Sequence, residues 1–338
     1  MTERPHSDVS PFTMPPSAAR ESGRGTGVIR VLYVAGFGRC GSTLLDRLLG
    51  QDPHYHSGGE LIRVWRLWSL GGNRLCSCGE PVSSCSFWKA VQQRALGTVP
   101  STMVEELDQY LSTTSRAQSL HRLLLSVSRK RLLLDAPPGS IEMLRDLYRA
   151  LAETSEREVI IDSSKSPAYL YLLAQVPGID LRVIHLVRDP RAVAYSWSRS
   201  PVPDPDGRAV MPRWGPANAA LLWLGINAMT NRVVKQIAVP LARVRYEDLV
   251  RDTVGVLAKI KTFGWSAGGE TASADVSGTE VALPSGHLCS GNPMRFQRGT
   301  VQIKEDVAWR SEMSARNRRL VETLAFPLLL RYRYTLGR

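Results

Sequence analysis

One stretch of the chain, from Val31 to Leu49, restricts the fold more than any other. It opens with an apolar run that is typical of a buried strand. A glycine-rich loop follows, and then a helical pattern of leucines. Glycines let the backbone approach a ligand closely, and the N–H groups of the loop and of the helix start point towards an anion. The stretch therefore predicts a phosphate-binding loop around Gly36, Gly38 and Gly41.

The loop differs at one position from the phosphate loop of nucleoside triphosphatases. Its outer glycines and the final Thr43 fit that pattern, but Ser42 stands where the pattern has lysine. The positive charge lies inside the loop, on Arg39. Such a loop can hold a phosphate group but is poorly suited to γ-phosphoryl transfer. The alternative for this stretch alone is an ordinary strand, turn and helix with glycines for tight packing.

A second strand, predicted at residues 159–161, leads into a loop that carries a lysine. Ser166 and Pro167 are a typical helix start, with serine as cap and proline in the first turn. Lys165 therefore lies at the carboxyl end of the strand, where open α/β sheets bind ligands. The apolar run that ends in Asp162 also resembles the magnesium-binding strand of phosphate-loop nucleoside triphosphatases. This likeness keeps an ATP-dependent kinase open as an alternative.

A third segment, residues 181–196, predicts a strand that ends at Arg188 and a helix that begins with Asp189 and Pro190. Ser196 lies about two turns into that helix, on roughly the same face as its start. The arginine and the hydroxyl could together bind a further phosphate group. The alternative is a well-capped helix with surface arginines.

Four motifs resemble those of sulfotransferases that use 3′-phosphoadenosine 5′-phosphosulfate (PAPS). They are GFGRCGSTLL at 36–45, DSSKSP at 162–167, HLVRDPRAVAYS at 185–196 and RYEDL at 245–249. The resemblance implies an α/β fold related to P-loop nucleoside triphosphatases, with a central, mostly parallel sheet flanked by helices and with a helical insertion. It also implies that PAPS is the co-substrate and that the reaction requires no metal.

The resemblance further implies roles for individual residues. Glu60, which follows two glycines at a predicted helix start, would be the general base, although a helix-start glutamate can also merely favour the helix dipole. Arg39 and Lys165 would complete the catalytic set by neutralising charge on the sulfuryl and leaving phosphate oxygens. Arg188 and Ser196 would bind the 3′-phosphate, which distinguishes PAPS from ATP. The other residues expected to bind PAPS are Cys40, Gly41, Ser42, Thr43, Leu44, Tyr246, Arg295, Arg298 and Gly299. Glu247, next to Tyr246, is expected to make structural hydrogen bonds.

Three of the five cysteines, Cys76, Cys78 and Cys85, lie close together in the sequence. They could be zinc ligands, but a closed structural zinc site usually has four ligands. The fourth would have to come from elsewhere, as Cys289 or a histidine. Free thiols and a disulfide that includes Cys85 are the alternatives, and no metal site is predicted.

Composition limits the domain organisation and the partners. The chain has 338 residues and a formal net charge of +12, and 43% of its residues are hydrophobic. We expect a disordered tail at 1–27 and one domain at 28–338, with a helical, cysteine-containing insertion at about 61–152. The positive charge favours anionic ligands, but no basic repeat interleaved with aromatics predicts nucleic-acid binding. No apolar run is long enough for a membrane span, the N-terminus lacks a secretory signal, and a cytoplasmic location is expected.

These observations predict a sulfotransferase that transfers a sulfuryl group from PAPS to a hydroxyl of a carbohydrate, glycolipid or secondary-metabolite acceptor. The alternatives are an ATP-dependent small-molecule kinase and a non-catalytic anion-binding protein. We expect the helical insertion and the Pro/Gly-rich loop at 201–216 to shape the acceptor pocket. Residues 264–285 are expected to form a polar loop. The sequence does not indicate whether the protein is a monomer or an oligomer.

Overall fold

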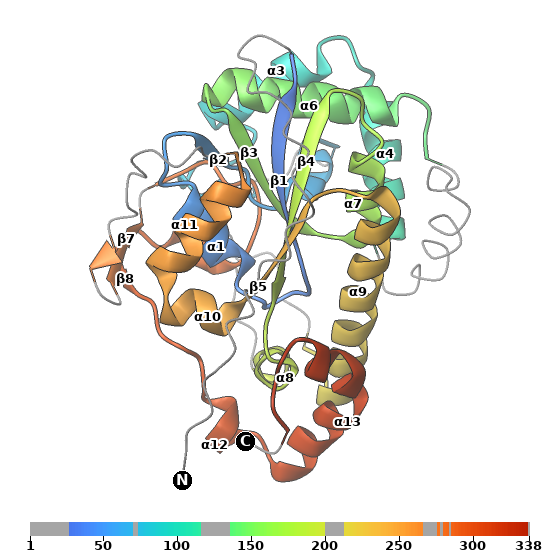
Figure 1. Ribbon diagram of the computed structural model, residues 1–338. Coiled ribbons are helices and arrows are strands. Elements are labelled where there is room, and N and C mark those ends of the chain that lie inside the picture. The colour runs from blue at the N-terminus through green and yellow to red at the C-terminus, as the bar shows by residue number, and fades with distance from the viewer. Residues whose placement is uncertain are drawn as a thin grey trace.

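A five-stranded parallel sheet forms the centre of the chain (Figure 1). The computed structural model describes residues 27–69, 74–115, 136–199, 213–265, 276–277, 280–283 and 285–336. The strands follow the order β2-β3-β1-β4-β5 and have the bounds β1 (Ile29–Ala35), β2 (Tyr55–Ser57), β3 (Val159–Lys165), β4 (Ile179–Val187) and β5 (Leu241–Arg245). The predicted α/β class with a mostly parallel sheet is therefore confirmed. Most of the expected N-terminal tail and of the loop at 201–216 lies outside the described residues.

Helices cover both faces of this sheet, which explains why its central strand is apolar and buried from Val31 to Ala35. In β1, Val31 and Tyr33 belong to one hydrophobic cluster, whereas Leu32 and Val34 belong to another. The first cluster includes residues of α6 (Ser140–Ser155), α7 (Pro167–Leu173) and α9 (Pro216–Ile237). The second includes residues of α1 (Ser42–Leu49), α10 (Tyr246–Arg251) and α11 (Thr253–Phe263). The period of two along a strand thus places alternate side chains in separate cores.

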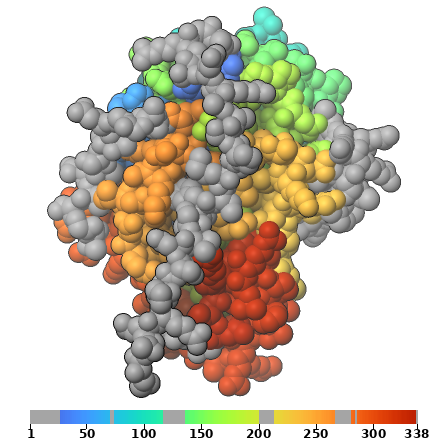
Figure 2. Space-filling view, viewed as in Figure 1, coloured from blue at the N-terminus to red at the C-terminus, as the bar shows by residue number. Residues whose placement is uncertain are grey.

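A third cluster joins α8 (Pro190–Ser198), α9, α12 (Trp309–Glu312) and α13 (Ala315–Arg331). Figure 2 shows residues of α13, in red, below those of α9, in yellow, on the face in view. Although α9 has 22 residues, none of the helices in the described part of the chain is long and apolar enough to cross a membrane.

The predicted caps of two helices are present. The Ser166 hydroxyl accepts a hydrogen bond from the Tyr169 N–H at 3.2 Å, at the start of α7. The Asp189 carboxylate accepts one from the Arg191 N–H at 2.8 Å, at the start of α8. Both helices begin directly after a strand of the sheet, so these caps fix the loops at its carboxyl edge.

Helices dominate the segment between β2 and β3, as the leucine spacing predicted. They are η1 (Leu61–Arg63), α2 (Val64–Ser69), α3 (Ser86–Leu96), α4 (Ser101–Thr114) and α6. Figure 1 shows α3 and α6 at the end of the sheet opposite α8 and α13. Residues 116–135, part of the predicted insertion, lie outside the described residues.

The expectation of a polar loop at residues 264–285 is wrong in part. Two strands, β6 (Val276–Ser277) and β7 (Glu280–Leu283), form a small antiparallel sheet with β8 (Gly299–Gln302). Val281 and Leu283 are buried against the cluster that contains α1 and α11. The sequence did not predict β7, because small polar residues surround its short alternating pattern. Its partner strand β8 comes from a later part of the chain.

A fully buried carboxylate lies in β3. Asp162 Oδ2 accepts a hydrogen bond from the Tyr148 hydroxyl at 2.5 Å, and Oδ1 accepts one from the Ser164 N–H at 2.9 Å. The Ser164 hydroxyl also donates to Oδ1. Burial raises the pKa of Asp162 to about 6, although the hydrogen bonds from Ser164 and Tyr148 act in the opposite direction.

This shift predicts a pH-dependent stability that Asp162→Asn should remove. Because the folded chain keeps a proton that the unfolded chain releases near its ordinary pKa of 3.8, the contribution of Asp162 to stability falls as pH rises to about 6. Between pH 4 and pH 7, we expect the free energy of unfolding of the variant to rise by up to about 3 kcal/mol relative to that of the wild type. Urea denaturation at several pH values measures this difference. Parallel profiles for the two proteins would contradict it, and Glu106→Gln, at an exposed site on α4, is the control.

Candidate active site

At two positions, the loop between β1 and α1 has a backbone conformation that only glycine adopts easily. Gly36 has φ 149° and Gly41 has φ 95°. A Cβ at Gly36 would lie 2.4 Å from the Leu186 carbonyl oxygen, and one at Gly41 would lie 2.5 Å from the Tyr246 ring. Both glycines are therefore required by backbone conformation and by close neighbours.

The predicted anion-binding residues from Cys40 to Leu44 lie in this loop and in the first turn of α1. Gly41 is the N-cap residue, and no side chain caps the helix there. The Thr43 hydroxyl accepts a hydrogen bond at 3.2 Å from the N–H of Asn292, in a loop far away in the sequence. The start of α1 thus combines backbone donors with the favourable end of the helix dipole, the arrangement that binds phosphate groups.

Two arginines meet beside this loop. Arg188 Nη1 donates a hydrogen bond to the carbonyl oxygen of Arg39 at 2.9 Å. Burial and the neighbouring charge of Arg188 lower the pKa of Arg39. Within the described part of the chain, the Nε atoms of both arginines are buried and have no hydrogen-bond partner. An anion placed between them would relieve their repulsion and could accept these hydrogen bonds.

Arg188 is held in place by three further groups. Its Nη2 donates to Asp306 at 3.0 Å, and its guanidinium lies 4.4 Å from the centre of the Tyr246 ring. Trp223 donates to the Arg188 carbonyl oxygen at 3.1 Å. Asp306 was not predicted from the sequence, because its loop showed no motif. A phosphate bound to Arg188 must share it with this carboxylate or displace it.

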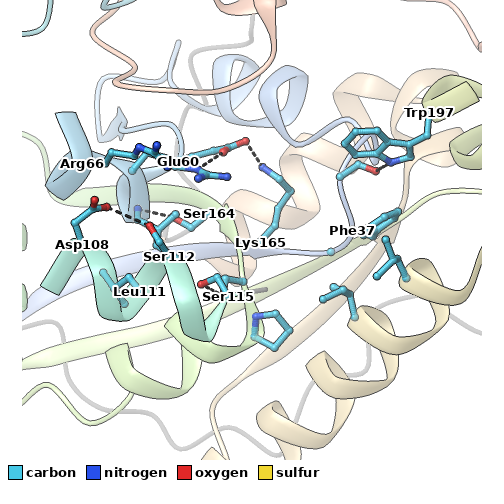
Figure 3. Close-up of a pocket in the computed structure, with 18 of the residues that line it drawn as sticks. Phe37, Glu60, Arg66, Asp108, Leu111, Ser112, Ser115, Ser164, Lys165 and Trp197 are labelled. Carbon is cyan, nitrogen blue, oxygen red and sulfur yellow. Dashed lines mark hydrogen bonds and ion pairs between the residues drawn. The ribbon is translucent and has the colours of Figure 1, made fainter. Parts of the chain in front are cut away.

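Glu60 and Lys165 form an ion pair, with 2.7 Å between Oε1 and Nζ (Figure 3). Glu60 follows the glycine turn after β2, and Lys165 is the last residue of β3 with φ 65°. Burial alone would raise the pKa of Glu60, but the charges of Lys165, Arg63 and Arg295 outweigh it and lower the pKa. The carboxylate is therefore charged at neutral pH and available to accept a proton.

Asp46, on α1, fixes the segments that carry this ion pair. It accepts hydrogen bonds from the Ser57 hydroxyl at 2.5 Å, the Gly59 N–H at 3.1 Å and the Ser163 hydroxyl at 2.7 Å. Gly59 directly precedes Glu60, and Ser163 lies two residues before Lys165. Burial raises the pKa of Asp46 to about 6. The sequence did not reveal this residue, because an aspartate next to Arg47 on a short helix has no distinctive pattern.

A cavity of about 550 Å³ adjoins the ion pair. One wall consists of the aromatic side chains Phe37, Trp197 and Trp214, and the opposite end is polar, with Arg66 and Asp108 (Figure 3). Glu60 and Lys165 lie between these ends (Figure 3), and Gly36 and Gly38 of the predicted phosphate loop also line the cavity. The helical insertion contributes through α2 and α4, so part of it lines this cavity.

Arg295, Arg298 and Gly299, the three late-loop residues that were expected to bind PAPS, have different surroundings. Arg295, in η3 (Pro293–Phe296), is buried, donates to the Gly291 carbonyl oxygen at 2.7 Å and lies near enough to Glu60 to lower its pKa. Arg298 is exposed and donates to the Cys78 carbonyl oxygen at 2.5 Å. Gly299 begins β8. In the part of the chain that the structure describes, no hydrogen bond or ion pair joins Arg298 or Gly299 to Arg188.

The remaining predicted residues lie as follows. Tyr246 begins α10, with its ring between Gly41 and Arg188. Ser196 lies in α8 and is partly buried, and the hydrogen bonds described for Arg188 do not include it. Glu247 accepts hydrogen bonds from the Asp189 N–H at 2.9 Å and the Tyr334 hydroxyl at 2.8 Å, which confirms its expected structural role.

The phosphate loop gives a direct test by substitution. Gly41→Ala places a methyl group against the Tyr246 ring and forces a left-handed backbone, so we expect at least a tenfold loss of affinity for adenosine 3′,5′-bisphosphate (PAP), which corresponds to about 1.4 kcal/mol. Gly178→Ala is the matched control, because Gly178 has φ 83° and no neighbour within 4 Å of its added Cβ. Calorimetric titration measures both variants. Equal affinities would contradict the assigned role of the loop.

The chain is similar to several solved sulfotransferase structures. The chain aligns with the sulfotransferase domain of the curacin biosynthetic pathway over 92% of its own length and 99% of that domain, at 16% identity and a TM-score of 0.50. It also aligns with the sulfotransferase domain of the Synechococcus PCC 7002 olefin synthase over 90% of its own length and 98% of that domain, at 21% identity and a TM-score of 0.45. A third alignment, with sulfotransferase STF9 of Mycobacterium avium, covers 92% of this chain and 79% of that protein, at 16% identity and a TM-score of 0.44.

A search of curated protein sequences gave no match. The profile of the sulfotransferase family, in contrast, matches residues 32–264, which include the phosphate loop, Glu60, Lys165 and Arg188. The match covers more than half of the chain, and the chain therefore belongs to the sulfotransferase family.

Proposed function

We propose that this protein transfers a sulfuryl group from PAPS to a hydroxyl group of a small acceptor molecule. The observation that carries the proposal is the position of Glu60 and Lys165. A carboxylate and an ammonium group lie 2.7 Å apart, beside the phosphate loop, and both line a cavity large enough for a small molecule. An acceptor in the cavity and a donor on the loop would meet at these two side chains.

The proposed reaction uses the two members of the ion pair for different tasks. Glu60 takes the proton of the acceptor hydroxyl, and the acceptor oxygen attacks the sulfur atom. As the bond between sulfur and the bridging oxygen breaks, Lys165 and Arg39 stabilise the negative charge that develops on the sulfuryl and 5′-phosphate oxygens. The products are the sulfated acceptor and PAP. When Lys165 turns towards the donor, Glu60 loses its nearest cation, its pKa rises, and it becomes a stronger base.

The donor-binding residues fit a nucleotide with two phosphate positions. The loop from Gly36 to Thr43 and the start of α1 offer backbone N–H groups to the 5′-phosphosulfate. Arg188, with the ring of Tyr246 beside it, would bind the 3′-phosphate together with Ser196. Of the late-loop arginines, Arg295 lies closer to the catalytic pair, which supports a role for it near the sulfuryl group.

The cavity supports a hydroxylated acceptor with both apolar and polar surfaces. Trp197 and Trp214 stack with 4.2 Å between their ring centres, and Phe37 stacks on Trp214 at 5.9 Å. At the other end, Asp108 accepts a hydrogen bond from Ser112 at 3.3 Å. Aromatic faces with charged and hydroxyl groups opposite suit a carbohydrate, a glycolipid head group or a secondary metabolite.

Two observations weigh against an ATP-dependent kinase. Ser42 replaces the lysine of the triphosphatase loop. Asp162, the expected magnesium ligand in that interpretation, has both oxygens hydrogen-bonded to Tyr148 and Ser164 in the interior. A non-catalytic anion-binding protein would have no need for Glu60 beside a cavity, since a carboxylate repels anions.

Glu60→Gln tests the proposed general base. Glutamine has the same shape and can still accept a hydrogen bond from Lys165, but it cannot take a proton. We expect transfer from radiolabelled PAPS to the best acceptor of a hydroxyl-compound panel to fall by about 100-fold or more, with PAP affinity within a few-fold of the wild type.

Glu158→Gln provides the control, because it is the same chemical change at an exposed glutamate paired with Arg30. Its transfer rate should equal that of the wild type. Near-normal turnover of Glu60→Gln would remove Glu60 from the mechanism, and hydrolysis of ATP with magnesium by the wild type would favour the kinase.

A further inference from the structure

Four potential metal ligands converge in a part of the structure outside the proposed active site. They are Cys76, Cys78, Cys85 and His287, and their ligand atoms all lie within 4.8 Å of one another. The three cysteines precede and begin α3, whereas the histidine comes from the loop between β7 and η3. The chain therefore brings together at one point two segments that lie about two hundred residues apart in sequence.

Three distances within this cluster are close to those of a tetrahedral zinc site. Around one zinc ion with bonds of about 2.3 Å to sulfur and about 2.0–2.1 Å to nitrogen, a tetrahedron separates two sulfurs by about 3.8 Å and a sulfur from a nitrogen by about 3.6 Å. The Sγ atoms of Cys78 and Cys85 are 3.8 Å apart. His287 Nδ1 lies 3.7 Å from Cys76 Sγ and 3.4 Å from Cys85 Sγ. All five cysteines of the chain are free thiols, and 3.8 Å is far longer than a disulfide bond of about 2.05 Å.

The cysteine segment is bent so that its thiols face one centre. Gly79 has φ 99°, its N–H donates to the Cys76 carbonyl oxygen at 2.9 Å, and the Cys76 N–H donates to the Glu80 carbonyl oxygen at 2.8 Å. This turn places Cys76 and Cys78 on the same side. Cys85 is the N-cap residue of α3, so the start of that helix fixes the backbone that carries the third thiol.

His287 is oriented by contacts that do not involve the thiols. Its ring stacks on Phe87 with 4.9 Å between centres and an angle of 12°, and its carbonyl oxygen accepts a hydrogen bond from Trp88 at 2.9 Å. On either side of it, Ser77 donates to the Gly286 carbonyl oxygen at 2.7 Å and accepts from the Leu288 N–H at 2.9 Å. Nδ1 is thus directed at the sulfurs by the surrounding structure, as is typical of metal-ligating histidines.

We propose that Cys76, Cys78, Cys85 and His287 bind one structural zinc ion. Three thiolates and an imidazole select zinc over magnesium or calcium, which prefer oxygen ligands. Four protein ligands fill the tetrahedron and leave no open position, so the ion takes no part in the transfer reaction. Binding releases the thiol protons to solvent. The sequence led us to expect no metal site, because the fourth ligand could not be found without the fold.

The zinc ion would hold the loop that is hydrogen-bonded to the backbone at Gly58 and Glu60. Two residues after His287, the Cys289 N–H donates to the Gly58 carbonyl oxygen at 3.3 Å, and the Glu60 N–H donates to the Ser290 carbonyl oxygen at 3.3 Å. The same loop then reaches Thr43 through Asn292. A metal at His287 would therefore stabilise the backbone at Gly58 and Glu60 and the start of α1.

The test is the metal content of the full-length chain, purified without chelators and measured by inductively coupled plasma mass spectrometry. We expect about one zinc ion per chain. His287→Ala and Cys85→Ser should lose most of the zinc. Cys289→Ala is the matched control, because its thiol is buried two residues from His287 but lies outside the cluster, and it should retain the ion.

A second measurement on the wild type covers the case in which a ligand variant fails to fold. Thiol modification of the native protein should release about one zinc ion per chain to a chromogenic chelator, and cobalt substitution should give the absorption bands of tetrahedral thiolate coordination. Folded wild-type protein without bound zinc that also fails to take up added zinc would overturn the proposal. So would undiminished zinc in both ligand variants, or a disulfide between Cys78 and Cys85 found by mass spectrometry.

Discussion

The ion pair between Glu60 and Lys165 is the interaction on which the proposed chemistry depends. Glu60 follows β2 after the turn at Gly59, which has φ 76°, and Lys165 ends β3 with φ 65°. Asp46 connects them, because it receives hydrogen bonds from Gly59 and from Ser163. In the proposed mechanism, the backbone around both residues stays fixed beside the phosphate loop, and only the Lys165 side chain has to turn when the donor binds.

Burying a charged group is unfavourable in free energy, and the structure nevertheless buries charged groups at a few positions. Asp46 and Asp162 are both fully buried, and burial raises the pKa of each to about 6, yet every oxygen of each carboxylate has a hydrogen-bond donor. Arg39 and Arg188 place like charges side by side next to the loop. Strain of this kind is concentrated around sites that bind charged ligands, where the ligand supplies the missing partner. The anion that we propose would turn the repulsion between the arginines into a favourable interaction.

The sequence predicted most of the fold because its strands and helix starts carry local signals. Short apolar runs marked β1 and β3, a mostly apolar segment marked β4, and the caps Ser166 and Asp189 marked two helices. Residues that act through distant contacts were not predictable: Asp46 and Asp306 lie in segments without a motif, and His287 joins the cysteines only in the folded chain. The late-loop arginines show the same limit, since Arg295 and Arg298, three residues apart, contact different parts of the molecule.

The measurement that tests the central claim most directly is calorimetric titration of the full-length chain with PAP, with AMP and with ATP plus magnesium. A PAPS-dependent enzyme should bind PAP at least about tenfold more tightly than AMP or ATP, and Arg188→Ala should abolish that preference. Arg94→Ala, at an exposed arginine of α3 bonded to Thr154, should leave it unchanged. Tighter binding of ATP with magnesium, or equal affinity for PAP and AMP, would contradict the assignment of PAPS as the donor.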